Sequence, residues 1–397
     1  MKIVSAALLC VTLACAVFTS WVHAQWPTSV PEAAVFSLLA VWAVAGLAGK
    51  VELRFSAAMI PLALVLVWGA VQIAAGLTIY PWRGKVAILY WACNLATFFI
   101  ALQVSADGRA RSWFLQSLVL LGFLLSILGP LQELYGGGKV LFFFEPEPRF
   151  VPQFGPFPYR NQYAAFIELL LPIALYRALG DEQRRTFYVL AAAVMYASII
   201  AAGSRMGFFL ATAEMLAVPV LLSISGKLRI RSLRNNALLF GAIFIMLVVA
   251  AGPADMLVKF RNPDPYAGRR EYSESSLKMI QAKPLTGFGL GAWATAYPGY
   301  ALFDDGLIVN QAHNDWVQWA AEGGIPMLGL MLWLAVWAVP RALRSGWGAG
   351  VVAVFIHSFV DYPIQRMSVA LLMFFMLAAL SSVSRTADSP DARRAAA

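Results

Sequence analysis

Residues 311 to 324 read Gln311-Ala-His313-Asn314-Asp315-Trp-Val-Gln318-Trp-Ala-Ala-Glu322-Gly323-Gly324, and a mainly apolar run continues from them to about residue 339. A run of this length is typical of a helix that crosses the ~30 Å hydrocarbon core of a bilayer. Ionisable side chains beside hydrocarbon are costly and persist mainly where they line a cavity and have a function. The stretch therefore predicts a membrane helix with a functional site at one end.

The composition of the whole chain agrees with a membrane protein. Hydrophobic residues make up 60% of the 397 residues and charged residues 13%, and the mean hydropathy is +0.70. These values exclude an ordinary soluble domain. We predict an all-α integral membrane protein with about twelve transmembrane helices, some short or interrupted, over residues 3–21, 33–49, 57–77, 86–104, 113–130, 162–179, 186–203, 206–224, 236–252, 315–339, 347–360 and 367–384.

The predicted spans also divide the chain into segments. Residues 1–130 hold N-terminal transmembrane helices, 131–252 central helices with a first outer loop and a turn at Arg205, 253–314 a large outer loop, 315–384 C-terminal transmembrane helices, and 385–397 a cytoplasmic tail. Lys2, an apolar core and Val22-His23-Ala24 also resemble a cleavable signal peptide. Polytopic proteins usually keep their first helix, so we predict an uncleaved one.

The distribution of Lys and Arg predicts the orientation. In the short loops these residues favour the side that also holds both termini, and this bias marks the cytoplasmic side. The long loop 253–314 is also basic, but long loops are translocated largely regardless of charge. We therefore predict that both termini are cytoplasmic.

Basic residues on the outer side act against this insertion bias. They gather around the outer loops 131–161 and 253–314 and include Arg149, Arg160, Arg205, Lys259, Arg261, Arg269, Arg270, Lys278, Lys283 and Arg366. Two interpretations stand. An electropositive outer surface attracts a polyanionic substrate such as a lipid-linked pyrophosphate, and it also suits contact with anionic headgroups without any chemistry.

Arg205 has the most constrained position of these residues. Gly203-Ser204-Arg205-Met206-Gly207 joins two apolar spans with almost no loop, so the guanidinium is held at the membrane boundary. The five-donor fork of arginine suits a phosphate. A snorkelling structural arginine is the alternative.

The large loop has two recognisable parts. From Gly268 to Pro284, apolar Leu277, Met279 and Ile280 among polar residues predict a short amphipathic helix at the membrane interface. The following Gly287-Phe-Gly289-Leu-Gly291 predicts a loop in which backbone approaches a ligand closely. Because no strand precedes these glycines, they do not indicate a nucleotide site.

His313 stands at the start of the helix that follows. Asn314 or Asn310 is suited to cap that helix, which places the imidazole at the positive end of the helix dipole and favours its neutral form. Asp315, Gln318 and Glu322 share one face below it. One of them is expected to orient His313, which we predict to be catalytic; a hydrogen-bonded structural histidine is the alternative.

Two further features complete the polar inventory. His357 and Asp361 are four residues apart, and we expect them to bind each other as a structural lock. Cys10, Cys15 and Cys93 fall inside predicted spans and are expected to pack there. The chain has only three histidines, and its outer carboxylates lack ligand spacing, so we predict a protein that needs no metal and no cofactor.

Taken in order, several of these motifs resemble a known family. They are Gly155-Pro-Phe-Pro-Tyr159-Arg160-Asn161-Gln162-Tyr163-Ala164, Gly203-Ser204-Arg205, Gly268-Arg269 with Leu277-Lys-Met279-Ile280 and Pro284-Leu-Thr-Gly287-Phe-Gly289-Leu-Gly291, Ala312-His313-Asn314-Asp315, and His357-Ser-Phe-Val-Asp361. Over about residues 150–380 the chain resembles the O-antigen ligase and O-antigen polymerase superfamily of bacterial glycosyltransferases.

The resemblance implies a GT-C-like protein of the bacterial inner membrane with a large periplasmic loop and a periplasmic active site. It implies transfer of a glycan from undecaprenyl pyrophosphate by an inverting, metal-free reaction. Arg205 and Arg269, with Arg270 and Arg160, would bind the donor pyrophosphate, and His313 would deprotonate or position the acceptor hydroxyl. The supporting polar residues would be Asn161, Asn314, Asp315, Gln318, Glu322, His357 and Asp361.

Three functions remain open. One is a ligase that moves polysaccharide onto the lipid A core, and another is a polymerase or protein O-oligosaccharyltransferase. The third is a transporter of polysaccharide or lipid, against which stand the lack of an evident repeat and the concentration of polar motifs on one face. The expected partners are the lipid-linked donor, a glycan or lipid A core acceptor and membrane lipids, with no nucleic acid.

Overall fold

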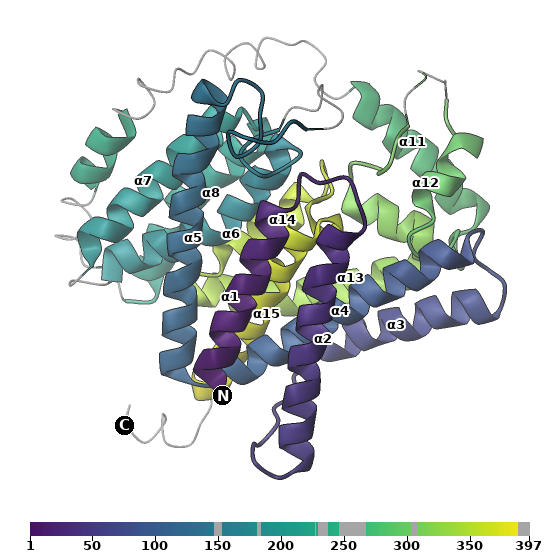
Figure 1. The fold of residues 1–397 in the computed structure, drawn as a ribbon, viewed down its shortest axis with the longest axis horizontal. Coiled ribbons are helices and arrows are strands. Elements are labelled where there is room, and N and C mark those ends of the chain that lie inside the picture. The colour runs from purple at the N-terminus through teal and green to yellow at the C-terminus, as the bar shows by residue number, and fades with distance from the viewer. Residues whose placement is uncertain are drawn as a thin grey trace.

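The computed structural model describes residues 1–146, 153–180, 184–226, 228, 237–245, 267–302, 306 and 308–387. Across these residues the regular structure is helical, and the only strand-like contacts are isolated bridges between Val140 and Phe144 and between Phe154 and Phe157. The predicted all-α class is therefore confirmed (Figure 1).

The N-terminal third forms long helices that pack on one another and on the last helix of the chain. They are α1 (Lys2–Phe18), α2 (Trp26–Leu47), α3 (Met59–Ala74), α4 (Pro81–Ser105) and α5 (Gly108–Tyr135). Pro81 suits the first turn of α4, where no backbone N–H is needed. Apolar side chains of α1 lie in the common core, and Trp42 of α2 donates a hydrogen bond to Ser5. α1 is thus packed against its neighbours in the helix bundle.

The central helices surround α6 (Arg160–Gly180), whose side chains are almost all buried. α7 (Arg185–Ala202) and α8 (Arg205–Ile224) pack against it. Gly203 ends α7 with a positive φ of 65°, and Ser204 caps α8 by accepting a hydrogen bond from the Gly207 amide at 3.2 Å. The tight turn predicted from the two glycines is thus present, and it brings Arg205 to the first turn of α8.

The C-terminal part forms a cap and the last helices of the chain. The cap consists of α11 (Ala267–Ala282), α12 (Trp293–Ala296) and η1 (Tyr297–Gly299), and the last helices are α13 (Asp315–Ser345), α14 (Ala349–His357), η2 (Pro363–Gln365) and α15 (Met367–Ala387). α11 is the predicted amphipathic helix, but Leu277 on it is exposed and Met279 is buried. Met279 and Ile280 therefore face inward as an amphipathic helix requires, whereas Leu277 does not.

α13 is broken near its start. Gly324 has φ 69° and ψ −172°, which is not helical, so residues 315–323 form a separate short helix before the long apolar part. The amides of Phe288 and Gly289 donate to the carbonyl oxygens of Ala321 and Glu322 at 3.0 and 2.9 Å. A side chain at Gly287 would meet the carbonyl of Glu322. The glycines were predicted to let the backbone approach a ligand closely, and in the structure Gly287 lies against α13, Gly289 against Thr78 and Gly291 against Arg83.

Within the described residues, seven helices are long and apolar enough to cross a membrane, namely α2, α4, α5, α6, α7, α8 and α13. α1, α3 and residues 367–382 of α15 are shorter apolar helices. α14 has nine residues, far fewer than the ~20 that a crossing needs, so the predicted span 347–360 is not a full transmembrane helix. In the predicted span 236–252, residues 237–245 are described and helical, and the remainder lies outside the described residues.

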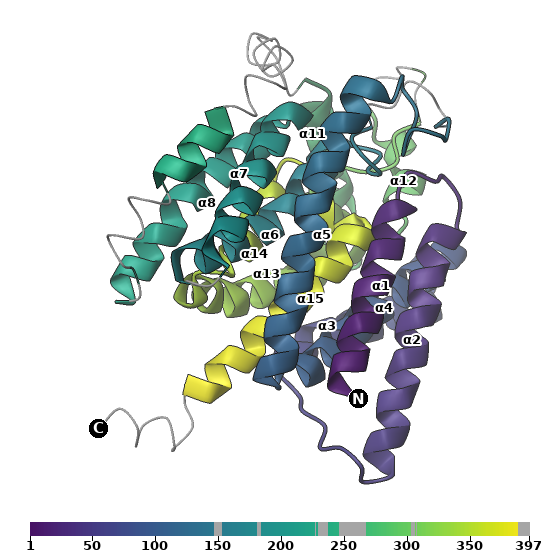
Figure 2. The same cartoon turned by 60° about the vertical axis from the view of Figure 1, so that its left-hand side comes forward.

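Different elements lie at the two ends of the molecule. The start of α1 and the end of α15 lie at the lower end in both views, whereas α11 and α12 lie at the upper end (Figures 1 and 2). The last residue of α15, Ala387, lies past residue 384, where the cytoplasmic tail was predicted to follow.

Candidate functional site

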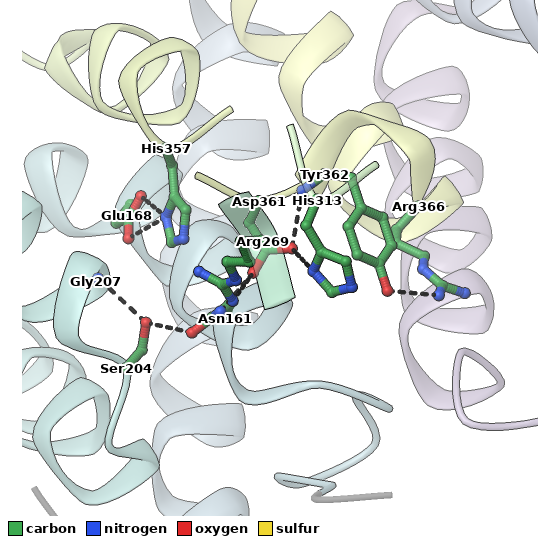
Figure 3. Close-up of polar contacts among 10 residues, drawn as sticks. All are labelled: Asn161, Glu168, Ser204, Gly207, Arg269, His313, His357, Asp361, Tyr362 and Arg366. Carbon is green, nitrogen blue, oxygen red and sulfur yellow. Dashed lines mark hydrogen bonds and ion pairs between the residues drawn. The ribbon is translucent and has the colours of Figure 1, made fainter. Parts of the chain in front are cut away.

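Asp361 lies at the centre of a polar cluster drawn from distant parts of the chain. It follows α14, and its carboxylate is met by Asn161 from the first turn of α6, Arg269 from the first turn of α11, and His313 from the loop before α13 (Figure 3). These residues were each expected to belong to a site. The structure brings them together around one carboxylate that is almost fully buried.

The contacts divide between the two carboxylate oxygens. Oδ2 accepts a hydrogen bond from the Asn161 amide and lies 3.3 Å from an Arg269 guanidinium nitrogen. Oδ1 accepts from the backbone amide of Tyr362 at 2.9 Å and lies 3.6 Å from Nδ1 of His313. The last distance is slightly beyond a hydrogen bond and still suits an ion pair.

The electrostatics of Asp361 follow from these neighbours. Burial alone would raise the pKa of this carboxyl, but the facing imidazole of His313 and the charge of Arg269 outweigh burial and hold the pKa well below its ordinary value. Asp361 is therefore a permanent anion at any pH near neutrality. An anion at that position favours a proton on Nδ1 of His313 and leaves Nε2 as the nitrogen able to accept one.

The backbone of His313 is unusual for a residue with a side chain. Its φ is +52°, in the left-handed region, where histidine is more common than most residues but still rare. The next residue, Asn314, caps α13 by accepting a hydrogen bond from the Val317 amide at 3.1 Å, as predicted. The imidazole stacks on Tyr272 and meets Tyr362 edge-on, with ring centroids 5.7 and 4.7 Å away. Main chain and rings together fix its position.

Arg205 joins the cluster through its neighbour in sequence. The hydroxyl of Ser204 donates to the side-chain oxygen of Asn161 at 2.8 Å, and Asn161 in turn donates to Asp361 (Figure 3). The start of α8, which carries Arg205, is thereby tied to the carboxylate. Arg205 is half-buried and Arg270 is exposed.

The predicted stripe on α13 is present, and Gln318 on it accepts a hydrogen bond at 3.0 Å from the amide of Ala312, the residue before His313. Asp315, Gln318 and Glu322 are all buried. Asp315 accepts from the Ser358 hydroxyl and the Ile364 amide at 3.0 and 3.1 Å. Glu322 accepts from the backbone amides of residues 291 and 293 and from Gln318. These carboxylates hold the broken helix in place, and Asp361 is the acidic group that faces the imidazole.

The predicted contact between His357 and Asp361 is present only in the backbone, where the Asp361 amide donates to the His357 carbonyl oxygen at 3.0 Å, and the His357 imidazole binds another residue. Its Nδ1 lies 2.9 and 3.0 Å from the two carboxylate oxygens of Glu168 on α6. Both side chains are fully buried. α14 ends at His357, whose imidazole faces α6. The chain then turns, and Asp361 faces α11.

Arg160 is engaged in a different contact from the one expected. It forms an ion pair with Glu133 at 2.6 Å and donates to the carbonyl oxygen of Ala202 at 3.3 Å. These contacts join α6 to the ends of α5 and α7. A guanidinium used in this way has a clear structural role near the site.

A cavity of about 810 Å³ lies beside the cluster. Its walls come from the α1–α2 turn, the first turns of α4, the chain between α12 and α13, and the start of α15. Glu322 and Gln318 of the stripe line it, as do Tyr159 and Arg366. The volume falls in the range of ~300–1,000 Å³ that is typical of small-molecule sites.

Sequence reasoning missed Glu168, Tyr272 and Tyr362. Glu168 carried a usable signal, because a carboxylate in an otherwise apolar span needs a partner. The two tyrosines carried none, since only the fold brings α11 and the residues after α14 against His313. Among the described residues, no group of three or more His, Cys, Asp or Glu side chains is arranged to hold a metal ion.

Comparison with known families adds an independent finding. Residues 190–334 match the family model described as O-Antigen ligase. The matched segment contains Arg205, Arg269 and His313, whereas Asn161 and Asp361 lie outside it. A search of curated proteins returns no match.

Proposed function

With the resemblance to the O-antigen ligase superfamily confirmed over residues 190–334, we propose that this multi-pass membrane protein transfers a glycan from undecaprenyl pyrophosphate to an acceptor hydroxyl. The observation that carries the proposal is the meeting of His313, Asp361 and Arg269 at one point. A general base oriented by a carboxylate and placed beside a cation is what glycosyl transfer from a pyrophosphate requires. We propose an O-antigen ligase as the specific role.

The donor pyrophosphate is assigned to the arginines. Arg269 binds Asp361, Arg205 follows Ser204, which binds Asn161, and Arg270 is exposed on α11. A departing pyrophosphate gains charge as the sugar–oxygen bond breaks, and guanidinium groups stabilise that charge without proton transfer. Arg160 has a supporting part, because its guanidinium is already paired with Glu133.

His313 is assigned to the acceptor. The hydroxyl oxygen of the acceptor attacks the anomeric carbon, its proton passes to Nε2 of His313, and the bond from that carbon to the pyrophosphate oxygen breaks with inversion. Asp361 stabilises the imidazolium that forms, because it remains ionised and faces Nδ1. The proton later leaves to solvent or to the released pyrophosphate. The reaction as proposed needs no metal ion.

The membrane setting follows from the two ends of the helix bundle. We assign the end with α11 and α12 to the periplasm and the end where α1 starts and α15 finishes to the cytoplasm, in a bacterial inner membrane (Figure 2). This choice agrees with the charge bias of the short loops. A polyprenyl chain then lies in the bilayer while its pyrophosphate reaches the cluster at the outer face.

The test is reconstitution of the purified full chain in nanodiscs with an undecaprenyl-pyrophosphate-linked glycan and a lipid A core acceptor. Glycan transfer that survives chelation by EDTA supports the proposal, and donor consumption without a new glycosidic bond contradicts it. A deletion strain separates the ligase from the polymerase. Loss of a ligase leaves free core with lipid-linked polymer, whereas loss of a polymerase leaves single repeat units.

A further inference from the structure

The cavity lies close to His313, and Arg366 and Tyr362 connect the two. Arg366 lines the cavity and donates a hydrogen bond to the Tyr362 hydroxyl at 3.2 Å, and the Tyr362 ring meets the imidazole edge-on. In Figure 3 Arg366 lies on the opposite side of His313 from Asn161 and Ser204. The cavity and the donor arginines therefore approach the proposed base from different directions.

The charges on the cavity wall are unbalanced toward positive. Arg83 and Arg366 line it, and within the described residues neither forms an ion pair with a carboxylate. The one carboxylate among the lining side chains, Glu322, already accepts three hydrogen bonds. The N-terminal end of α4, which carries Arg83, adds the positive end of a helix dipole.

Unsatisfied polar atoms also face this region. Nε of Arg366 and Oγ of Ser368 are buried and have no hydrogen-bond partner among the described residues. A buried polar group without a partner costs free energy, which a ligand that supplies the missing contact restores. Arg366 is held in place by the rings of Tyr159 and Tyr362, 5.7 and 5.2 Å from its guanidinium carbon.

We infer that this cavity is the acceptor subsite and that it selects an acceptor sugar carrying an anionic group, a phosphate or a carboxylate. Arg366 binds the anion at the inner end and Arg83 at the exposed mouth. The tyrosines at the wall offer ring faces to the sugar and hydroxyls to its oxygens. The inference rests on the proposed function, because it assigns the second substrate of that reaction.

The test uses variants that leave the cluster intact. Arg83→Gln removes the exposed cation, and Ala294→Trp fills part of the cavity. Lys85→Gln is the matched control, since Lys85 is also exposed on the first turns of α4 but does not line the cavity. Arg366 is unsuited to the test, because its loss would release Tyr362 and so disturb His313.

The readouts are the KM for the acceptor and for the donor, measured with a phosphate-bearing lipid A core and with the same acceptor after dephosphorylation. Arg83→Gln should raise the KM for the phosphorylated acceptor about tenfold, equivalent to about 1.4 kcal/mol, with little effect on the dephosphorylated one. The donor KM should not change, and Lys85→Gln should alter neither. A rise in donor KM, or an equal rise with both acceptors, overturns the inference.

Direct binding separates failure of this inference from failure of the proposed function. The probe is the deacylated, phosphate-bearing core oligosaccharide, titrated into the full chain without donor. Binding that Arg83→Gln and Ala294→Trp both weaken supports the subsite even where no transfer occurs. A carboxylate-bearing oligosaccharide tells the two anions apart. If the effect of Arg83→Gln appears only in nanodiscs with anionic lipid, the cavity holds a headgroup and the inference is wrong.

Discussion

Arg269 and Asp361 are 92 positions apart in the sequence and lie 3.3 Å from each other. The contact joins the first turn of α11, in the cap, to the chain that follows α14, in the helix bundle. The arginine that we assign to the donor pyrophosphate and the acid that faces the proposed base therefore share one ion pair. Under the proposed function, this ion pair links the donor site to the base.

His313→Asn should abolish most glycan transfer while leaving donor binding largely intact. Asparagine tolerates the left-handed backbone at this position better than alanine does, so the change removes the base with little strain. A general base contributes a factor of ~10² to 10⁴ in rate. Turnover and donor affinity should be measured on the same preparation, with His313→Ala alongside. Parallel loss of donor affinity would place His313 in the pyrophosphate site.

Arg205→Lys should lose most activity and remain folded. An ammonium keeps the charge but not the bidentate fork that suits a phosphate. The matched control is Arg160→Lys, because Arg160 is paired with Glu133 and should tolerate the change better. Activity and thermal unfolding in detergent are the measurements. Full activity in Arg205→Lys would reduce Arg205 to an anchor at the membrane boundary.

Asp361→Asn should cost both activity and stability at neutral pH. The pKa of Asp361 is depressed in the folded protein, so its charge stabilises the fold above the ordinary value of about 3.9 and ceases to do so as pH falls below it. The melting temperatures of wild type and variant should therefore differ at pH 7 and converge as pH is lowered past about 4. A difference that is constant with pH would assign the effect to packing.

Glu168→Leu or His357→Phe alone should destabilise the fold by about 3–5 kcal/mol, since each leaves a buried polar or charged partner alone. The double variant should recover much of that loss. Urea or thermal unfolding of the four proteins forms a double-mutant cycle. Additive effects would mean that the two side chains act independently.

Topology is tested by cysteine labelling in a background without Cys10, Cys15 and Cys93. Lys278→Cys on α11 and Ser225→Cys after α8 are both exposed. A membrane-impermeant thiol reagent applied from the periplasm should label the former and spare the latter. The opposite result would place the cluster in the cytoplasm and remove the polyprenyl donor from the proposal.

The sequence predicted those features that depend on residues close together in the chain, namely helices, helix caps and turns. Apolar length predicted the helices, Asn314 was predicted as the cap of α13, and the glycines predicted the turn before Arg205. Which side chains meet depends on how the helices rotate and cross. The i, i+4 spacing of His357 and Asp361 suggested a pair, yet α14 ends between them, and each finds a partner far along the chain.

The site shows the same division. The motif residues were recognisable one by one, and their order along the chain indicated the family. The side chain that orients His313 was sought on the helix that follows it, at Asp315, Gln318 or Glu322, because periodicity relates only residues of one element. Asp361 comes from a different segment of the fold, and the sequence pattern of neither segment indicates that it lies next to His313.

The break at Gly324 has a practical consequence for recombining this gene with its homologues. Residues 284–291 and 321–325 are bound backbone to backbone, with the Ile325 amide donating to Pro284 at 2.8 Å and side chains excluded at Gly287 and Gly324. The two stretches behave as one cassette. A chimera with a crossover between residues 291 and 321 would join halves shaped for different partners, whereas crossovers before residue 284 or after residue 325 keep the cassette whole.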